Sequence, residues 1–236
     1  MIVLSLDTCT SYGSVALLRD DVVLSLATHD TPEDYSSWLL PAVDRVLSEV
    51  QLTLSYVDVF AVAAGPGSFT ALRVGLTTVK AWGELFGKPI VPVSRLEIIA
   101  AQARAGTEYV AAWADAARGQ VFGAVYRRAG AVLERLRDEV VIEPGKFIEL
   151  AANLTKGARI AWASPDTDCM FKTPEWQSRQ PLNESFDLVS PALAVAIARK
   201  AASEFAAGRH TDALLLDANY VRRSDAEIFW KGYAHG

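Results

Sequence analysis

A strand passes into a helix at Gly65-Pro66-Gly67-Ser68-Phe69-Thr70-Ala71-Leu72-Arg73-Val74-Gly75, the most informative segment of the chain. Residues 57–64 before it are mostly apolar and predict a buried strand that stops at the glycines. The glycines and the proline permit a sharp turn, and Ser68 or Thr70 is suited to cap the following helix. Free N–H groups at a helix start attract anions, and Arg73 adds a planar cation for a phosphate or a carboxylate.

The first hundred residues alternate between strand and helix patterns. Short alternating segments predict a meander of three strands, after which apolar residues recur at helical spacing. Ser94 and Glu97 have the spacing of a capping box, which marks the start of a third helix. The expected order is strands at 2–7, 14–19 and 22–28, a helix at 36–50, a strand at 57–64, a helix at 69–86, a strand at 90–93 and a helix from Ser94.

The same order starts again near residue 108, although no repeat of individual residues accompanies it. The expected elements are strands near 109–114, 120–127 and 131–142, a helix near 145–154, a strand near 158–163 and a helix at 191–207. Residues 164–189 contain three prolines and little periodicity, so they predict a long connection.

The order βββαβα therefore occurs twice, which predicts an α/β fold of two lobes that face each other. This duplicated arrangement is the architecture of the actin-like ATPases and the sugar kinases. We expect a first lobe at residues 1–104, a second lobe at 105–211, and a tail at 212–236 that returns to pack on the first lobe.

The composition describes an acidic protein with ample core material. With 51% hydrophobic residues among 236, the chain is long enough for one large domain or two lobes. The net charge of −5 and the lack of a basic stripe predict weak direct binding to RNA. Cys9 and Cys169 have no CxxC spacing, so reduced thiols are expected. We expect no membrane span and a cytoplasmic location, because no basic leader or apolar run near ~20 residues is seen.

Small polar residues at the end of the first strand are candidates for phosphate chemistry. Asp7 offers a hard oxygen ligand for hydrated magnesium, and the hydroxyls beside it are suited to contact phosphate. The alternative is that Asp7 only caps its turn and that the hydroxyls satisfy loop backbone groups. Asp115 occupies the matching strand end in the second half. The candidate phosphate or nucleotide contacts are Asp7, Thr8, Thr10, Ser68, Thr70 and Asp115.

Other catalytic classes lack their sequence signals. No GxxxxGK[ST] or GxGxxG pattern is present, and the loop at 163–166 lacks the paired glycines that usually cradle a nucleotide in this architecture. His29, His210 and His235 are scattered, so no metal site is expected. Cys9 is either a small core residue or a loop thiolate without an identified base. We therefore expect no complete active site in this chain.

The segment GPGSFTALRVG closely resembles the GPGSFTGLRIG signature of the bacterial TsaB (YeaZ) family. Further segments that resemble family landmarks are residues 2–10, 36–41, 115–122 and 219–227. The chain departs from the family pattern at Ala71, where the signature has glycine, at Ala117, where the family has arginine, and at Tyr35, where it often has histidine. The resemblance spans essentially the whole chain and independently implies the duplicated actin-like fold.

The resemblance implies a non-catalytic subunit of the bacterial machinery that installs threonylcarbamoyl on the adenosine beside the anticodon of tRNA. In that family the catalytic partner TsaD performs the transfer, and the ATPase TsaE docks on the complex. The resemblance thus implies that the chain binds and activates TsaD, and that it meets tRNA only through the complex. It implies no cofactor required by the chain itself, while ATP or ADP with magnesium is a candidate at the partner interface.

The two long helices of the first half are the expected partner surface, because the corresponding helices of the family form a bundle with TsaD or with another copy. Small residues let helices approach closely, and tryptophan is a frequent interface anchor. The expected interface residues are Ser37, Trp38, Asp44, Arg45, Phe69, Arg73, Thr77, Lys80 and Trp82. The alternative is that Trp38 and Trp82 face the chain's own core.

Two other functions stay open from the sequence. One is a stand-alone actin-like ATPase or phosphotransferase that uses Asp7 and Asp115 with magnesium, which robust nucleotide turnover by the purified chain would reveal. The other is a homodimeric structural protein with no link to tRNA, which pull-downs would recover only with itself.

Overall fold

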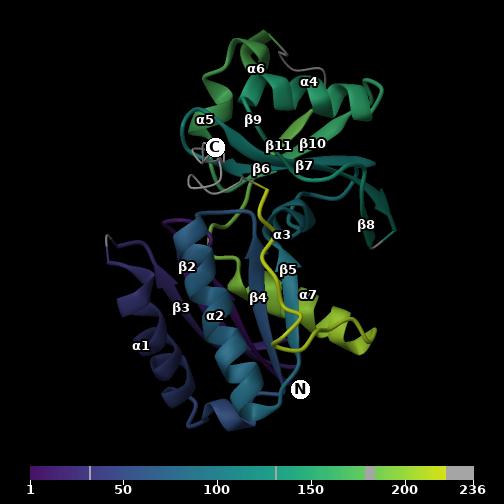
Figure 1. Cartoon of the computed structure of the whole chain (residues 1–236). Helices are drawn as coiled ribbons and strands as arrows, with labels where there is room; N and C mark the ends of the chain where they lie inside the picture. The colour runs from purple at the N-terminus through teal and green to yellow at the C-terminus, as the bar shows by residue number, and fades with distance from the viewer. Residues whose placement is uncertain (32, 131, 179–183, 222–236) are drawn as a thin grey trace, which may run out of the picture.

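Two mixed β-sheets form two lobes, which lie one above the other in Figure 1. The computed structural model describes residues 1–31, 33–130, 132–178 and 184–221. Residues 222–236 of the expected tail therefore lie outside the described residues. In the part of the chain that is described, no helix has the length and apolar character needed to cross a bilayer.

The first lobe is built on a five-stranded sheet with the order β3-β2-β1-β4-β5. β1 runs antiparallel to β2 and parallel to β4, so the meander and the next buried strand share one sheet. The elements are β1 (Ile2–Asp7), β2 (Gly13–Arg19), β3 (Val22–His29), α1 (Tyr35–Ser48), the 3-10 turn η1 (Leu54–Tyr56), β4 (Val59–Gly65), α2 (Phe69–Phe86), β5 (Ile90–Ser94) and α3 (Arg95–Ala101). The helices α1 and α2 pack on this sheet.

The second lobe repeats this plan with the order β8-β7-β6-β10-β11. Its central strand β6 is antiparallel to β7 and parallel to β10, as β1 is to β2 and β4. The elements are β6 (Tyr109–Asp115), β7 (Val121–Ala129), β8 (Val132–Arg135), β9 (Val140–Ile142), α4 (Pro144–Leu154), β10 (Ile160–Ser164), α5 (Asp168–Phe171), α6 (Pro174–Ser178), β11 (Ser185–Leu188) and α7 (Ala194–Ala206). The predicted duplicated α/β fold is confirmed.

Two segments of the second lobe differ from the sequence prediction. Residues 131–142 were expected to form one strand, but they contain two, β8 and β9, which pair with different parts of β7. Residues 164–189 were expected to be a connection, but they contain α5, α6 and β11, and β11 extends the sheet beside β10. These elements are too short for a periodic pattern and are held by aromatic packing. Each contributes one aromatic residue that packs against Trp113, namely Phe171, Trp176 and Phe186.

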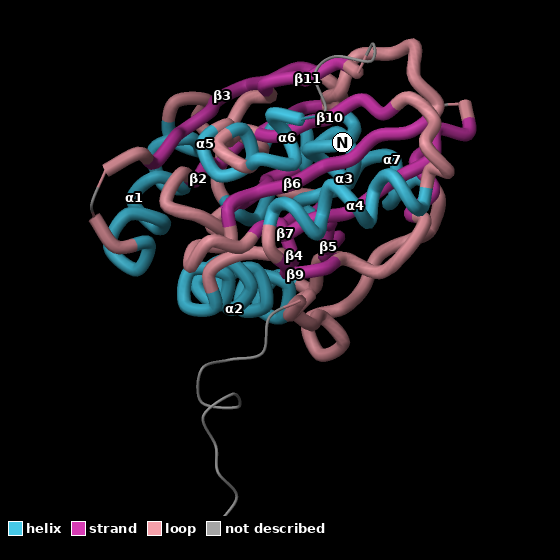
Figure 2. The backbone as a smooth tube through the Cα atoms, turned by 90° about the horizontal axis from the view of Figure 1, so that it is seen from above, coloured by secondary structure: helices cyan, strands magenta, loops and turns pink. Residues whose placement is uncertain are grey.

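Each sheet is covered on one side by a helix from the other half of the chain. The helix α3 packs on β6, β7 and β10 of the second sheet, and α7 packs on β1, β2 and β4 of the first. The view from above shows the second sheet over α3 (Figure 2). The lobe bounds at residues 104 and 211 stay a prediction, but α7 packs on the first sheet although it lies within 105–211.

Two buried serines attach the start of α7 to the first sheet. Ser14 Oγ accepts a hydrogen bond from the Ala194 N–H at 3.0 Å, and Ser5 Oγ donates to the Ala194 carbonyl at 2.7 Å. Both serines are fully buried on adjacent strands. These polar bonds fix the position of α7, because apolar contact alone permits a helix to slide.

We expect Ser5→Ala and Ser14→Ala each to lower the free energy of unfolding by about 1–3 kcal/mol, because each leaves a buried group of Ala194 without its partner. The double variant should lose less than the sum, since both bonds hold one residue. Urea denaturation measures all three, and Ser48→Ala on the exposed side of α1 is the control, with a change within about 0.5 kcal/mol. Additive losses would contradict a shared anchor.

Candidate functional site: the cleft between the lobes

The loop between β4 and α2 packs directly on the turn between β1 and β2. The Gly65–Pro66 peptide bond is cis, and the Ser68 N–H donates to the Cys9 carbonyl at 2.7 Å. A side chain at Gly67 would overlap the Cys9 carbonyl, which explains the glycine at this position. Ser68 occupies the N-cap position of α2, but its side chain makes no capping hydrogen bond. The backbone, not the expected hydroxyl cap, therefore holds this helix start.

A buried ion pair lies beside this loop. Asp7 at the end of β1 is fully buried, and Arg95, the first residue of α3, is 2% exposed. Arg95 Nε lies 3.3 Å from Asp7 Oδ2, and Arg95 Nη2 lies 3.4 Å from Thr10 Oγ1. Asp7 Oδ1 accepts from the Cys9 N–H at 3.0 Å. Asp7 thus caps its own turn and neutralises a buried arginine.

The candidate phosphate contacts fall into two groups. Four of them line a cleft between the lobes: Thr10, Ser68, Thr70 and Asp115. Asp7 and Thr8 do not line it, because both are buried and their polar groups are used inside the fold. The Thr8 hydroxyl donates to the Ala71 carbonyl at 2.8 Å. The polar groups of Asp7 and Thr8 therefore lie inside the fold and not on the cleft.

The residues at the end of β1 do not fit a magnesium ion. Both oxygens of the Asp7 carboxylate are engaged, and one of them faces the Arg95 guanidinium. A divalent cation on the same carboxylate would lie beside that guanidinium, and two cations repel strongly where water is excluded. Among the residues that the structure describes, no group of three or more His, Cys, Asp or Glu side chains is placed to hold a metal ion.

The Cys9 side chain is a core residue. It is fully buried, and Sγ lies 3.6 Å from the Ala63 carbonyl. Burial, and next the nearby Asp7 carboxylate, raise the pKa of the Cys9 thiol well above its ordinary value. The thiol is therefore protonated at neutral pH, which argues against a thiolate nucleophile.

The second lobe contributes an acidic turn to the cleft. The Asp115 carboxylate accepts from the Ala117 N–H at 2.8 Å, and Asp166 Oδ2 accepts from the Asp115 N–H at 3.2 Å. Ala117 and Arg118 have φ values of 56° and 57°, so the backbone reverses sharply here. Both carboxylates are thus engaged by backbone N–H groups, that of Asp115 within its own turn and that of Asp166 at the end of β6.

The chain after α7 returns to the first lobe and forms another wall of the cleft. Thr211 and Ile90 form an antiparallel bridge, and the Asn219 N–H donates to the Ala64 carbonyl at 2.8 Å. Tyr220 follows and lines the cleft. The walls together enclose a cavity of about 680 Å³, a size that suits a small organic ligand.

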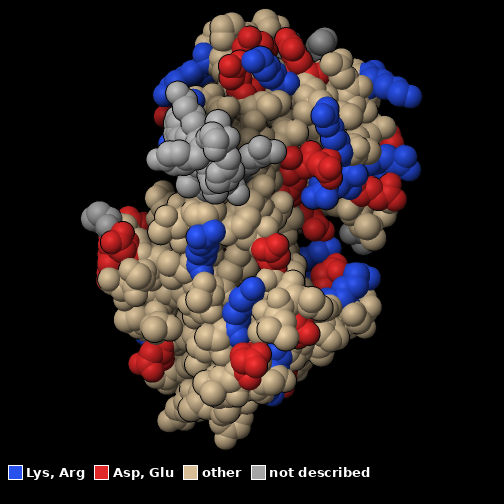
Figure 3. Space-filling model, viewed as in Figure 1, with Lys and Arg blue, Asp and Glu red and all other residues tan. Residues whose placement is uncertain are grey.

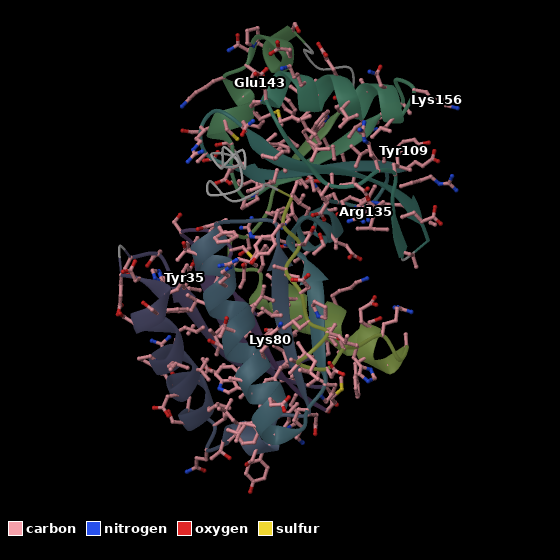
Figure 4. All side chains as sticks on the ribbon, in the orientation of Figure 1. Tyr35, Lys80, Tyr109, Arg135, Glu143 and Lys156 are labelled. Carbon is pink, nitrogen blue, oxygen red and sulfur yellow. The ribbon has the colours of Figure 1, made fainter. Side chains whose placement is uncertain are left out.

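Glu139 ties this returning segment to the second lobe. It is 2% exposed, and its carboxylate accepts hydrogen bonds of 2.5 Å from both Ser94 Oγ and Asn219 Nδ2. Arg135, labelled in Figure 4, lies 3.5 Å from the same carboxylate. Burial raises the pKa of Glu139, and these partners oppose the increase only in part.

Arg73 links α2 to the returning segment. Its guanidinium carbon lies 3.8 Å from the centre of the Phe69 ring, and its Nε donates to the Tyr220 hydroxyl at 2.9 Å. The cation is therefore positioned by a cation–π contact and a hydrogen bond. A substitution at Arg73 would remove one contact that holds this segment and would also change the surface charge.

The outer side of α1 and α2 carries most of the expected partner residues. Those that are exposed are Ser37, Asp44, Arg45, Arg73 and Thr77, and those that are half-buried are Trp38, Phe69 and Lys80. Trp82 was expected on this surface, but it is 8% exposed and packs on Phe60 with ring centres 5.5 Å apart. Figure 3 shows few charged side chains over these two helices, and Figure 4 labels Lys80 on α2.

Reasoning from the sequence missed Arg95 and Glu139 as site residues. The signal for Arg95 is a charged residue in a helix whose other buried residues are apolar. A buried charge requires a partner, so such a position points to an ion pair, but the pattern does not name the partner. Glu139 gives no comparable signal, because its surroundings in the sequence are charged.

The fold and cleft define a two-lobed α/β protein of the actin-like class. Residues 29–226 match the family model described as TsaD: tRNA N6-adenosine threonylcarbamoyltransferase. Over 150 residues the chain is 32% identical to the tRNA threonylcarbamoyladenosine biosynthesis protein TsaB of Bacillus subtilis (strain 168), an alignment that covers 64% of this chain and 66% of that protein.

Solved structures give the same result. YeaZ from Pseudomonas aeruginosa matches with a TM-score of 0.74 and 26% identity, covering 93% of this chain and 99% of that one. The ROK hexokinase from Thermus thermophilus shares the fold, with a TM-score of 0.55 and 14% identity over 88% of this chain and 100% of that one. The chain belongs to the TsaB (YeaZ) family, as its signature segment predicts, and named members of that family are threonylcarbamoyladenosine biosynthesis proteins.

We expect Arg95→Met to lower the free energy of unfolding by about 3–5 kcal/mol, because it leaves the Asp7 carboxylate buried without its cation. The double variant Asp7→Asn with Arg95→Met should lose less than Arg95→Met alone. Urea denaturation measures both. The control is Arg199→Met, whose ion pair with Asp21 is exposed and contributes about 0–1 kcal/mol. An equal effect of Arg95→Met and Arg199→Met would disprove the structural role of the buried pair.

A pH dependence follows from Glu139. Its folded-state pKa is raised above the ordinary 4.5, so the native state holds this proton more tightly than the unfolded chain does. The free energy of unfolding should therefore fall as the pH rises from 4.5 through the folded-state pKa, and Glu139→Gln should lack this component. Urea midpoints between pH 4.5 and 8 test it, with Glu84→Gln on exposed α2 surface as the control. A pH-independent difference between Glu139→Gln and the natural chain would refute it.

Proposed function

We propose that this chain is a non-catalytic subunit of the machinery that makes threonylcarbamoyladenosine in tRNA. It binds the catalytic threonylcarbamoyltransferase subunit, TsaD, and holds it in its active arrangement. It also offers a docking surface to the ATPase subunit TsaE. Family membership and the names of the relatives support this role.

The observation that carries the proposal is the outward face of α1 and α2. Leu40 on α1 is 57% exposed and Leu85 on α2 is 73% exposed, although the chain has ample core in which to bury leucine. Exposed large apolar side chains on a weakly charged helical face are typical of protein–protein interfaces. A helical partner surface would cover them. TsaD is the partner we propose, and a second copy of the chain is the competing occupant.

The mechanism we propose is binding energy applied to a partner's conformation. A subunit that binds the active state of TsaD ten times more tightly than the inactive state shifts that equilibrium by about 1.4 kcal/mol. The chain needs no active site of its own for this role. Its net charge of −5 supports contact with tRNA through the complex only.

The stand-alone ATPase or phosphotransferase is the weaker candidate. It requires Asp7 and Asp115 to act with magnesium, but Asp7 is buried and already paired with Arg95. The Asp115 carboxylate is likewise engaged, by the Ala117 N–H. If a nucleotide with magnesium binds at the interface with TsaD, TsaD supplies the ligands of the metal ion.

We expect Leu40→Asp to weaken the complex with TsaD at least tenfold, because it places a charge within the proposed apolar contact. Trp38 and Arg73 are poorer targets for substitution, because each also makes a contact within the chain. Trp38 packs on His29, and Arg73 donates a hydrogen bond to Tyr220. Calorimetry with purified TsaD measures the affinity. Threonylcarbamoyl transfer to a tRNA transcript with TsaD and TsaE present measures the activity, which should fall in parallel.

The matched control is Leu214→Asp, which changes a leucine that is 85% exposed in the segment after α7. It should bind TsaD and support modification like the natural chain. Equal binding by Leu40→Asp and the natural chain would show that the interface lies elsewhere. Steady nucleotide hydrolysis by the isolated chain would overturn the non-catalytic role, and self-association without any binding to TsaD would favour the homodimeric protein.

A further inference from the structure

Arg95 has a donor that the fold leaves unused. Its Nε and Nη2 are engaged by Asp7 and Thr10, but Nη1 is buried and has no hydrogen-bond partner among the described residues. An unsatisfied buried donor costs about 1–3 kcal/mol, and a charged one costs more. A buried water, an ion or an acceptor group of a ligand satisfies such a donor. Arg95 lines the cleft, so an acceptor there is within reach of the residue.

The start of α2 provides further donors on the same cleft. The Ser68 side chain does not cap this helix, and its first turn contains no acidic residue. The N–H groups of the first turn and the positive end of the helix dipole are therefore available to an anion. Ser68 and Thr70 are exposed at this end and line the cleft with Arg95.

The opposite wall limits the charge that the cleft accepts. Asp115 and Asp166 line it from the second lobe, and each carboxylate already accepts from a backbone N–H. Two carboxylates disfavour a ligand with several negative charges close to the second lobe. A single compact oxyanion on the side of the first lobe avoids them.

We propose that Arg95 and the first turn of α2 form a subsite for one phosphate or carboxylate group of a small molecule, bound without a metal ion. Arg95 Nη1 donates one hydrogen bond to the oxyanion, and the N–H groups at the start of α2 donate others. Metal is not required, because the unused Arg95 Nη1 and the N–H groups at the start of α2 supply the hydrogen-bond donors. This inference concerns the cleft and does not rest on the proposed binding to TsaD.

The test uses the full chain with inorganic phosphate and with acetate as probes. Thermal unfolding is followed at increasing probe concentration, with sodium chloride keeping the ionic strength constant. One titration contains EDTA, and a second contains magnesium chloride. We expect at least one probe to raise Tm in a saturable way, with the same midpoint in EDTA and in magnesium. A response to phosphate only assigns a phosphate group to the ligand, and a response to acetate only assigns a carboxylate.

Two matched variants locate the probe. Thr70→Glu places a tethered carboxylate at the second residue of α2, so it should weaken the probe's binding at least tenfold. Ser36→Glu places the same charge at the second residue of α1, which is exposed and outside the cleft, and it should leave the probe's binding unchanged. Both variants gain the same helix-dipole effect, so only the loss of probe binding distinguishes them.

Three results would overturn the subsite. One is the lack of a saturable response to either probe, and another is a response that needs magnesium. The third is equal binding of the probe by Thr70→Glu and Ser36→Glu, which would place the anion elsewhere on the surface.

Discussion

The ion pair between Asp7 and Arg95 connects three parts of the chain that are distant in sequence. Asp7 ends the central strand of the first sheet, and Arg95 begins the helix that covers the second sheet. The same two side chains also hold the turn after β1 through the Cys9 N–H and the Thr10 hydroxyl. The signature loop before α2 packs on that turn, where the Ser68 N–H donates a hydrogen bond to the Cys9 carbonyl. Because a buried charge is costly without its partner, the two lobes are tied together at this point.

The two lobes are also connected by helices that pack on the sheet of the opposite lobe. Each sheet relies on a helix from the other half, α7 on the first and α3 on the second, so neither half can complete its core alone. The cleft between them is consequently framed by parts of both lobes and by the segment after α7. The outward face of α1 and α2 takes no part in this framework. It is therefore free to serve association, and it meets the cleft at Phe69.

The long, periodic elements were predictable from the sequence, and the short ones were not. The helix α2 occupies the predicted residues 69–86, and Ser94 caps α3 as the capping box predicts. The strand β11 was missed because four residues held by aromatic packing leave no alternation to detect. At the site, residue types identified Asp7, but only the fold reveals that Arg95, 88 positions later, already neutralises it. Long-range pairing of charges has no local signal, and burial of Trp82 likewise depends on tertiary packing.

The most direct measurement concerns the carboxylate of Asp7 itself. Paramagnetic Mn²⁺ titrated into ¹⁵N-labelled chain broadens the amide signals of residues close to a bound ion. With Asp7 committed to Arg95, we expect the Cys9 and Thr10 signals to broaden no more than those beside the exposed Asp168. Selective broadening of Cys9 and Thr10 at low Mn²⁺ would show a working metal site at the end of β1, and it would contradict the conclusion that Asp7 is committed to Arg95 and does not hold a metal ion.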